Sequence, residues 1–182
     1  MKHIFFLFGL QILLFSCQNK KADHEKAKQF VTIINDNTSG EIKAVQQECV
    51  NKMTEALRSL KENDNAKIDT RQLRELLDRA KKANHLTFSA IIKTQEVDDE
   101  INLKQKALDE TELFRSLYEN ELPKLLEAFE SNGHNKFAKL TESANLLASR
   151  EQEIRKIQSA YKEAGDEFIN KYDINFTKDS TK

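Results

Sequence analysis

The feature that most constrains this fold is the spacing of its apolar residues, which recur at steps of three and four along most of the chain. That spacing places them on one face of an α-helix, which has about 3.6 residues per turn. The chain of 182 residues holds only four glycines and one proline, too few for a turn-rich fold such as a β-sandwich. Charged residues make up 32% of the sequence, as expected for solvated helix faces. The sequence therefore predicts an all-α fold.

Helices are expected over about residues 25–61, 70–94, 101–131 and 135–174. Because the links between these stretches are short, they are best satisfied by an elongated up-down four-helix bundle of long helices. The alternative is a three-helix, coiled-coil-like bundle, in which the second and third stretches are continuous through residues 94–100.

Local signals are expected to shape these helices. Gly40 lies within the first stretch and costs about 1 kcal/mol in a helix interior, so a kink or break is expected there. Asp69 is placed to cap the second stretch, with Gln72 completing a capping box. Pro123 lies inside the third stretch, where it removes a hydrogen bond and should kink the helix or start a new one.

The apolar stripes of the helices form the predicted core. The second stretch contributes Leu73, Leu76, Leu77, Ala80, Thr87, Ile91 and Ile92. The fourth stretch contributes a face with heptad spacing, made of Leu140, Ala144, Leu147, Ile154, Ile157, Tyr161, Ala164 and Phe168. Heptad spacing favours packing at shallow crossing angles, and it leaves open a homo-oligomer formed through this face.

The amino-terminal segment has the pattern of an export signal. Lys2 and His3 precede an apolar run from Ile4 to Phe15. A helix that spans a bilayer needs roughly 20 apolar residues, so this run is too short to span one. Its length is typical of the apolar part of a secretory signal.

The end of this run, Leu14, Phe15, Ser16 and Cys17, resembles the lipobox of bacterial lipoproteins. The resemblance implies signal cleavage between Ser16 and Cys17, a diacylglycerol on the Cys17 thiol and an acylated new amino terminus. Such lipid chains would hold the protein on a membrane. Gln18 is not the Asp associated with inner-membrane retention in enteric bacteria, so the outer membrane is expected. The alternatives are an ordinary secretory signal with an incidental cysteine and an uncleaved anchor.

The expected layout is a lipoprotein signal peptide over residues 1–16, a polar tether over 17–24, a helical bundle over 25–174 and a disordered tail over 175–182.

Removal of the signal takes away Lys2 and leaves 28 of 29 basic residues against 30 acidic ones, a net charge of −2. A nearly neutral chain with interleaved signs lacks the concentrated basic face that nucleic acids require. No nucleic-acid partner is expected.

The sequence shows no catalytic or metal-binding constellation. No Glu stands three residues before His24, His85 or His134, as in di-iron bundles, and no two histidines have the four-residue spacing of a zinc site. Residues 62–70, ENDNAKIDT, lack the first carboxylate, the glycine and the closing Glu of a calcium loop, so they are interpreted as an interhelical turn. A glycine-rich phosphate loop and a Gly-x-Ser-x-Gly motif are also missing. We therefore expect no enzymatic activity, no metal and no cofactor.

Other features have both a structural and a functional interpretation. Cys49 lies on an apolar stripe and is expected to be a small buried hydrophobe, with intermolecular pairing or a reactive thiol as the alternative. The acidic residues 96–100 suit the start of a helix, although they could attract a cation. The aromatic side chains of the third and fourth stretches are expected to pack in the core, or else to line a ligand cavity. They are Phe114, Tyr118, Tyr161, Phe168 and Tyr172.

Two segments, LFRSLYENELPKLL from Leu113 and REQEIRKIQSAYKEAGDEFINKYDI from Arg150, are similar to segments of an uncharacterised family of helical surface lipoproteins found in spirochaetes and Bacteroidota. The likeness depends on the spacing of aromatic and acidic residues and on the closing Phe-x-x-Lys-Tyr from Phe168 to Tyr172. Pro123 departs from the pattern of the family. The resemblance implies a helical lipoprotein and brings no activity or site residues with it.

Taken together, these patterns predict a lipid-anchored protein of the bacterial cell envelope. Its bundle is expected to be a non-enzymatic interaction or structural module with an envelope protein as partner. The alternative is a periplasmic or surface bundle that binds a small apolar or haem-like ligand among its aromatic residues.

Overall fold

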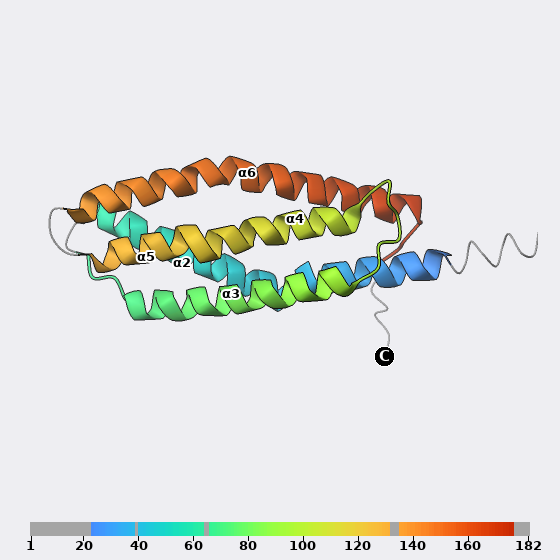
Figure 1. Ribbon diagram of the computed structural model, residues 1–182, viewed down its shortest axis with the longest axis horizontal. Helices are drawn as coiled ribbons and strands as arrows, with labels where there is room; N and C mark the ends of the chain where they lie inside the picture. Colours follow the sequence, from blue (N-terminus) through green and yellow to red (C-terminus); the bar gives the residue numbers. More distant parts are fainter. Residues whose placement is uncertain (1–22, 39, 64–65, 132–134, 177–182) are drawn as a thin grey trace, which may run out of the picture.

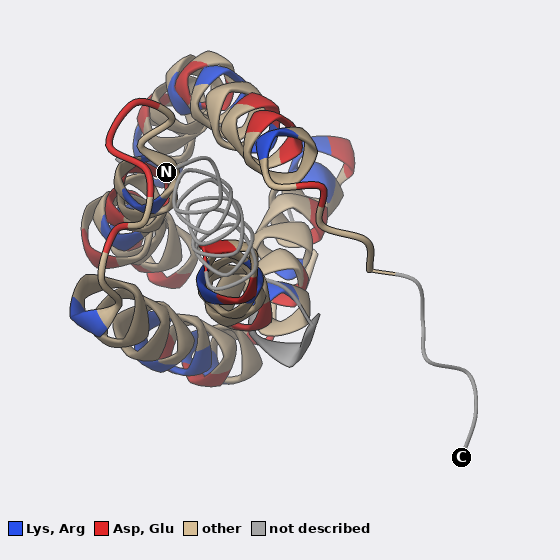
Figure 2. Cartoon of the chain, turned by 90° about the vertical axis from the view of Figure 1, so that its right-hand side faces the viewer, with Lys and Arg blue, Asp and Glu red and all other residues tan. Residues whose placement is uncertain are grey.

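The computed structural model describes residues 23–38, 40–63, 66–131 and 135–176. Within these ranges the chain is helical and contains no strand, which confirms the all-α prediction. The helices form an elongated bundle of four rods that run alternately up and down (Figure 1). Seen along the bundle, basic and acidic residues are interspersed on the helices (Figure 2).

The first rod consists of residues 23–38 and α2, the second of α3, the third of α4, η1 and α5, and the fourth of α6. The helix bounds are α2 (Gly40–Glu62), α3 (Thr70–Lys93), α4 (Leu103–Ser116), the π-helix η1 (Leu117–Glu121), α5 (Leu122–Glu130) and α6 (Asn135–Lys171). α3 packs on α2 and on α4, and α6 packs on α4 and α5.

The link between α3 and α4 rules out the three-helix alternative, because residues 94–102 are not helical. Asn102, which precedes α4, has a left-handed φ of 56°, a conformation that Asn tolerates better than most residues. Glu96 Oε2 accepts a hydrogen bond of 3.0 Å from the backbone N–H of Lys104 in the first turn of α4. The interpretation of the acidic residues as the start of a helix is therefore confirmed.

Asp98 fastens this link to the end of α6. Its Oδ1 accepts hydrogen bonds from the backbone N–H groups of Glu100 and Ile101, at 3.1 and 3.2 Å. Its Oδ2 lies 2.7 Å from Lys171 Nζ and accepts a hydrogen bond of 3.1 Å from the Tyr172 hydroxyl. Burial raises the pKa of Asp98, but the hydrogen bonds together outweigh it and hold the pKa below its ordinary value.

Pro123 lies at the start of a new helix, which is one of the two outcomes that the sequence predicted. It lies in the first turn of α5, directly after the π-helix η1. Because proline has no N–H to donate, the helix cannot continue its regular hydrogen bonding through this position. The N–H of Leu122 instead donates to the carbonyl of Leu117, five residues earlier, as in a π-helical turn.

The other predicted helix boundaries lie within three residues of those in the structure. Asp69 caps α3, since its side chain accepts a hydrogen bond of 3.0 Å from Gln72 N. α2 begins at Gly40, where a break was expected, and residue 39 lies outside the described residues. Residue 23, the first that the structure describes, is already helical, so residues 23 and 24 were wrongly assigned to the tether. His24, which was assigned to the tether, lies within the bundle with its Nδ1 2.7 Å from the carbonyl oxygen of Tyr172.

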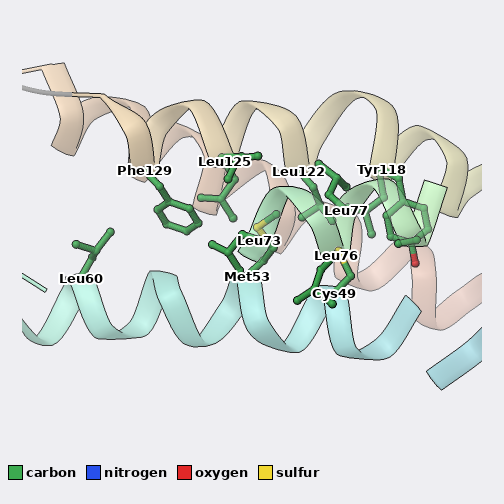
Figure 3. Close-up of a cluster of buried hydrophobic side chains, with 13 residues drawn as sticks. Cys49, Met53, Leu60, Leu73, Leu76, Leu77, Tyr118, Leu122, Leu125 and Phe129 are labelled. Carbon is green, nitrogen blue, oxygen red and sulfur yellow. The ribbon is translucent and has the colours of Figure 1, made fainter. Parts of the chain in front are cut away.

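Two clusters of buried side chains form the core. The aliphatic cluster joins α2, α3, η1 and α5 (Figure 3) and contains Cys49, Met53, Leu60, Leu73, Leu76, Leu77, Ala80, Leu117, Tyr118, Leu122, Leu125, Leu126 and Phe129. The aromatic cluster joins residues 23–38 to the ends of α3, α4 and α6. It contains Ala27, Phe30, Val31, Ile34, Ile91, Ile101, Leu103, Ala107, Ala164, Phe168 and Ile174.

The predicted stripes are only partly buried. On α3, Ile91 is fully buried but Ile92 is 50% exposed, so its assignment to the core was wrong. On α6, Phe168 and Ala164 are buried, whereas Leu147 and Ile154 are half-buried. The heptad face of α6 packs against both clusters of the same chain. It therefore packs within the bundle but is incompletely covered at Leu147 and Ile154.

Candidate functional site

The site is a groove that results from incomplete closure of the bundle. Residues 23–38 pack against the end of α6, where the rings of Phe30 and Phe168 lie 5.2 Å apart. Beyond residue 38, α2 packs mainly on α3 while α6 packs on α4 and α5, and α2 and α6 do not form a packed pair. A cavity of about 450 Å³, partly open to solvent, lies between them. We call it the α2–α6 groove, and its volume lies within the usual range of about 300 to 1,000 Å³ for ligand pockets.

One half of the groove is apolar. It is formed where the middle of α2 faces the middle of α6, with the third rod as its floor. Its apolar lining consists of Val50, Met53, Leu57, Phe114, Leu117, Leu122, Leu147, Ala148 and Ile154. Leu147 and Ile154 are the half-buried residues of the α6 heptad face, so the groove explains why this part of the predicted stripe is not fully covered.

The other half of the groove is polar and lies toward the aromatic cluster. Asn84 is 2% exposed, donates to the carbonyl of Thr111 at 3.0 Å and accepts from Gln46 Nε2 at 3.2 Å. The hydroxyl of Thr87 donates to the carbonyl of Asn37 at 2.9 Å. These hydrogen bonds fix the polar wall in place, because each joins two different rods.

Glu110 provides the charge in this polar half. Gln158 Nε2 on α6 donates a hydrogen bond of 3.1 Å to Glu110 Oε1. Burial raises the pKa of Glu110, and the hydrogen bond from Gln158 and the positive charge of Lys43 offset only part of that shift. Among the described residues, no cation lies within ion-pair distance of this carboxylate. Glu110 is therefore a partly buried acid without a paired counterion.

Two phenols lie near Glu110. Thr38 Oγ1 and Tyr161 Oη are 2.9 Å apart, and Thr38 also lines the groove. Burial and then the charge of Glu110 raise the pKa of Tyr161, although the hydrogen bond with Thr38 lowers it. Burial is also the main cause of the raised pKa of Tyr118, whose hydroxyl has no hydrogen-bond partner within the described part of the chain. The charge of Glu110 thus contributes to the raised pKa of both tyrosines.

A buried ion pair holds α6 against the third rod beside the groove. Glu121, in η1, is 3% exposed, and its Oε1 accepts a hydrogen bond of 2.9 Å from Arg150 Nε. Arg150 also pairs with Glu153 at 2.5 Å. The pair lies outside the lining of the groove, so its role is to position α6.

The residues singled out in the sequence are dispersed. Ser16, Cys17 and His134 lie outside the described residues. His85 is exposed on α3, apart from the groove. Cys49 is fully buried and burial raises the pKa of its thiol to about 12, which fits the prediction of a small buried hydrophobe. The described part of the segment 62–70 links α2 to α3, as an interhelical turn requires.

Of the five aromatic candidates, only Phe114 lines the groove. Tyr118 and Phe168 are fully buried in the two clusters, and the ring of Tyr172 packs at a tilt against that of Phe168 with ring centres 4.7 Å apart. Core packing is therefore their main use. The polar residues of the groove were missed, although Asn84 carried a signal, since it falls on the apolar stripe of α3 between Ala80 and Thr87.

Within the described residues, no three metal-ligating side chains converge on a common point. None of the described helices is long and apolar enough to cross a membrane. Comparison with protein-family models, with curated proteins and with solved structures found no match to this chain.

Proposed function

We propose that the protein is a lipid-anchored lipoprotein of a bacterial envelope, and that its bundle is a non-enzymatic module that binds a small amphipathic ligand in the α2–α6 groove. The observation that carries the proposal is the groove itself, because a bundle that served only as a spacer would gain stability by closing it. Its apolar half suits a hydrocarbon portion, and its polar half suits a hydrogen-bonding head group.

The groove is also preformed. Its floor is part of the aliphatic cluster, in which Leu122 is 1% exposed and Met53 is 1% exposed. Its polar wall is fixed by hydrogen bonds such as that from Asn84 to Thr111. A ligand that enters therefore loses little binding free energy to ordering of the protein.

Anchoring through Cys17 would hold the start of the bundle close to a membrane, with the groove farther along the bundle. The first described helix starts at residue 23, six positions after Cys17. A fully extended chain covers at most about 3.5 Å per residue, so six residues reach roughly 20 Å.

Incorporation of labelled palmitate into the expressed full chain tests the proposed lipid anchor. The label should be lost in a Cys17→Ser variant, and a variant that keeps it would contradict anchoring at this residue.

The ligand site is tested with N-phenyl-1-naphthylamine, an apolar dye that fluoresces when it leaves water. Ala148 and the adjacent Ser149 are both exposed on α6, but only Ala148 lines the groove. With the purified full chain, Ala148→Trp should weaken dye binding by about tenfold or more, because the indole fills space that the ligand needs. Ser149→Trp is the matched control and should bind like the unmodified protein. Equal dye binding by the two variants would contradict the groove as the site.

A further inference from the structure

The polar half of the groove presents mainly hydrogen-bond acceptors. Gln158 uses its Nε2 to donate to Glu110, and Gln46 uses its Nε2 to donate to Asn84. The amide oxygens of these two glutamines accept no hydrogen bond from the described residues. Glu110 Oε2 likewise receives no hydrogen bond from the described side chains. A ligand head group that donates hydrogen bonds would satisfy these oxygens.

The charge of the site favours a cation. Two carboxylates line the groove, but Glu151 is exposed and pairs with Arg155 at 2.6 Å, so Glu110 is the one without a paired counterion. Lys43 also lines the groove, but its side chain is exposed and forms no ion pair with Glu110. An anionic head group would be repelled by Glu110 in a partly dehydrated site. A cationic one would neutralise it.

The position of Phe114 in the lining also favours a cationic head group. Phe114 lies one helical turn after Glu110 on α4, and both side chains line the groove. A cation bound at Glu110 would therefore have an aromatic ring as a neighbour, and aromatic rings attract positive charge. From there the apolar half continues along Leu117, Leu122 and Leu147.

We propose that the α2–α6 groove recognises amphipathic amines, with the protonated amine bound by Glu110 and the acceptor oxygens of Gln158 and Gln46, and the hydrocarbon portion placed along the leucine-lined half. This inference rests on the proposed ligand-binding function, which it makes specific for one class of head group.

The experiment compares ligands that share one hydrocarbon chain and differ in head group. Octylammonium chloride, 1-octanol and sodium octanoate are titrated into the purified full chain near neutral pH, with binding measured by calorimetry. Octylammonium should bind about tenfold more tightly than octanol, which is the scale of one added charged hydrogen bond, and octanoate should bind most weakly.

The Glu110→Gln variant should lose the preference for octylammonium over octanol, and a cooperative urea transition would show that the variant is folded. Glu112→Gln is the matched control, because Glu112 lies on the same helix, is exposed and pairs with Arg115 outside the groove. It should keep the preference.

The possible failures can be told apart. Equal affinity for the three compounds, or tighter binding of octanoate, would overturn the amine assignment and leave the ligand site in place. The same holds if Glu110→Gln kept the preference for octylammonium. If none of the three compounds bound, the assignment and the proposed function would fail together.

Discussion

The two ends of the bundle differ in how the first rod meets α6. At one end, residues 23–38 place Phe30, Val31 and Ile34 against α6, and these side chains are at most 3% exposed. At the other end, Val50 and Thr54 of α2 and the facing part of α6 line a cavity of about 450 Å³. The aromatic cluster closes the first end, and the groove occupies the second.

The difference shows that an apolar stripe on one helix is not enough for close packing, because the facing helix must present apolar residues as well. α6 has heptad spacing along its whole length, from Leu140 to Phe168. Only where the facing rod offers a matching row of large apolar residues does this face become fully buried. Along the groove, Gln46, Gln47 and Thr54 interrupt the apolar residues Val50, Met53 and Leu57 of α2, so contact with water is retained and a cavity results. The groove is thus encoded by α2 as much as by α6.

The largest effect that this comparison predicts is a difference between two truncations on α6. Phe168→Ala should lower the free energy of unfolding by about 3 to 5 kcal/mol, because it removes a fully buried ring that contacts Phe30 and Tyr172. Leu147→Ala should lower it by only about 1 kcal/mol, because Leu147 is already half-exposed to the groove. Urea denaturation of both variants measures the difference. Losses of similar size would mean that α6 is packed evenly and that the comparison is wrong.

A second effect concerns the ion pair that holds α6 where apolar packing is thin. Arg150→Met should destabilise the protein by about 2 to 4 kcal/mol, because it leaves the buried carboxylate of Glu121 without its cation. Hydrogen exchange should then increase in the half of α6 beside the groove more than in the half near Phe168. The double variant Arg150→Met, Glu121→Leu removes the stranded charge and should recover most of the stability. Failure of this rescue would show that the pair acts through something other than charge burial.

The arrangement of the rods could be predicted from the sequence because its signals are local. Helical periodicity, the cap at Asp69 and the break at Pro123 each depend on residues within a few positions of one another. The groove depends instead on contacts such as that between Glu110 and Gln158, which are 48 residues apart. The spacing of residues along the sequence does not predict such long-range contacts. Ile92 was misassigned for a related reason, since adjacent residues on a helix are about 100° apart and only the partner helices decide which is covered.

A third effect separates the acid at the closed end from the acid in the groove. Asp98→Asn should destabilise the protein by about 1 to 2 kcal/mol at neutral pH, since it weakens the contacts with Lys171 and Tyr172 and Lys171 is largely solvated. The pKa of Asp98 lies below its ordinary value. Its stabilisation should therefore be complete above about pH 4 and be lost as the pH falls through the lowered pKa. A loss that stayed constant down to the acid transition would show that the charge of Asp98 is not involved.

The smallest effect has the opposite sign. Because burial raises the pKa of Glu110, its ionised form disfavours the folded state once the pH exceeds the ordinary value of about 4.3. Glu110→Gln should therefore raise the melting temperature at neutral pH, and this gain should disappear as the pH falls toward 4.3. The exposed Glu112 is the control, and Glu112→Gln should show no comparable gain. If Glu110→Gln lowered the melting temperature at neutral pH, Glu110 would be paired in the ligand-free protein and would not be available to a cationic ligand. A gain would mean that the carboxylate is kept in the groove at a cost in stability, as expected of a residue retained for binding.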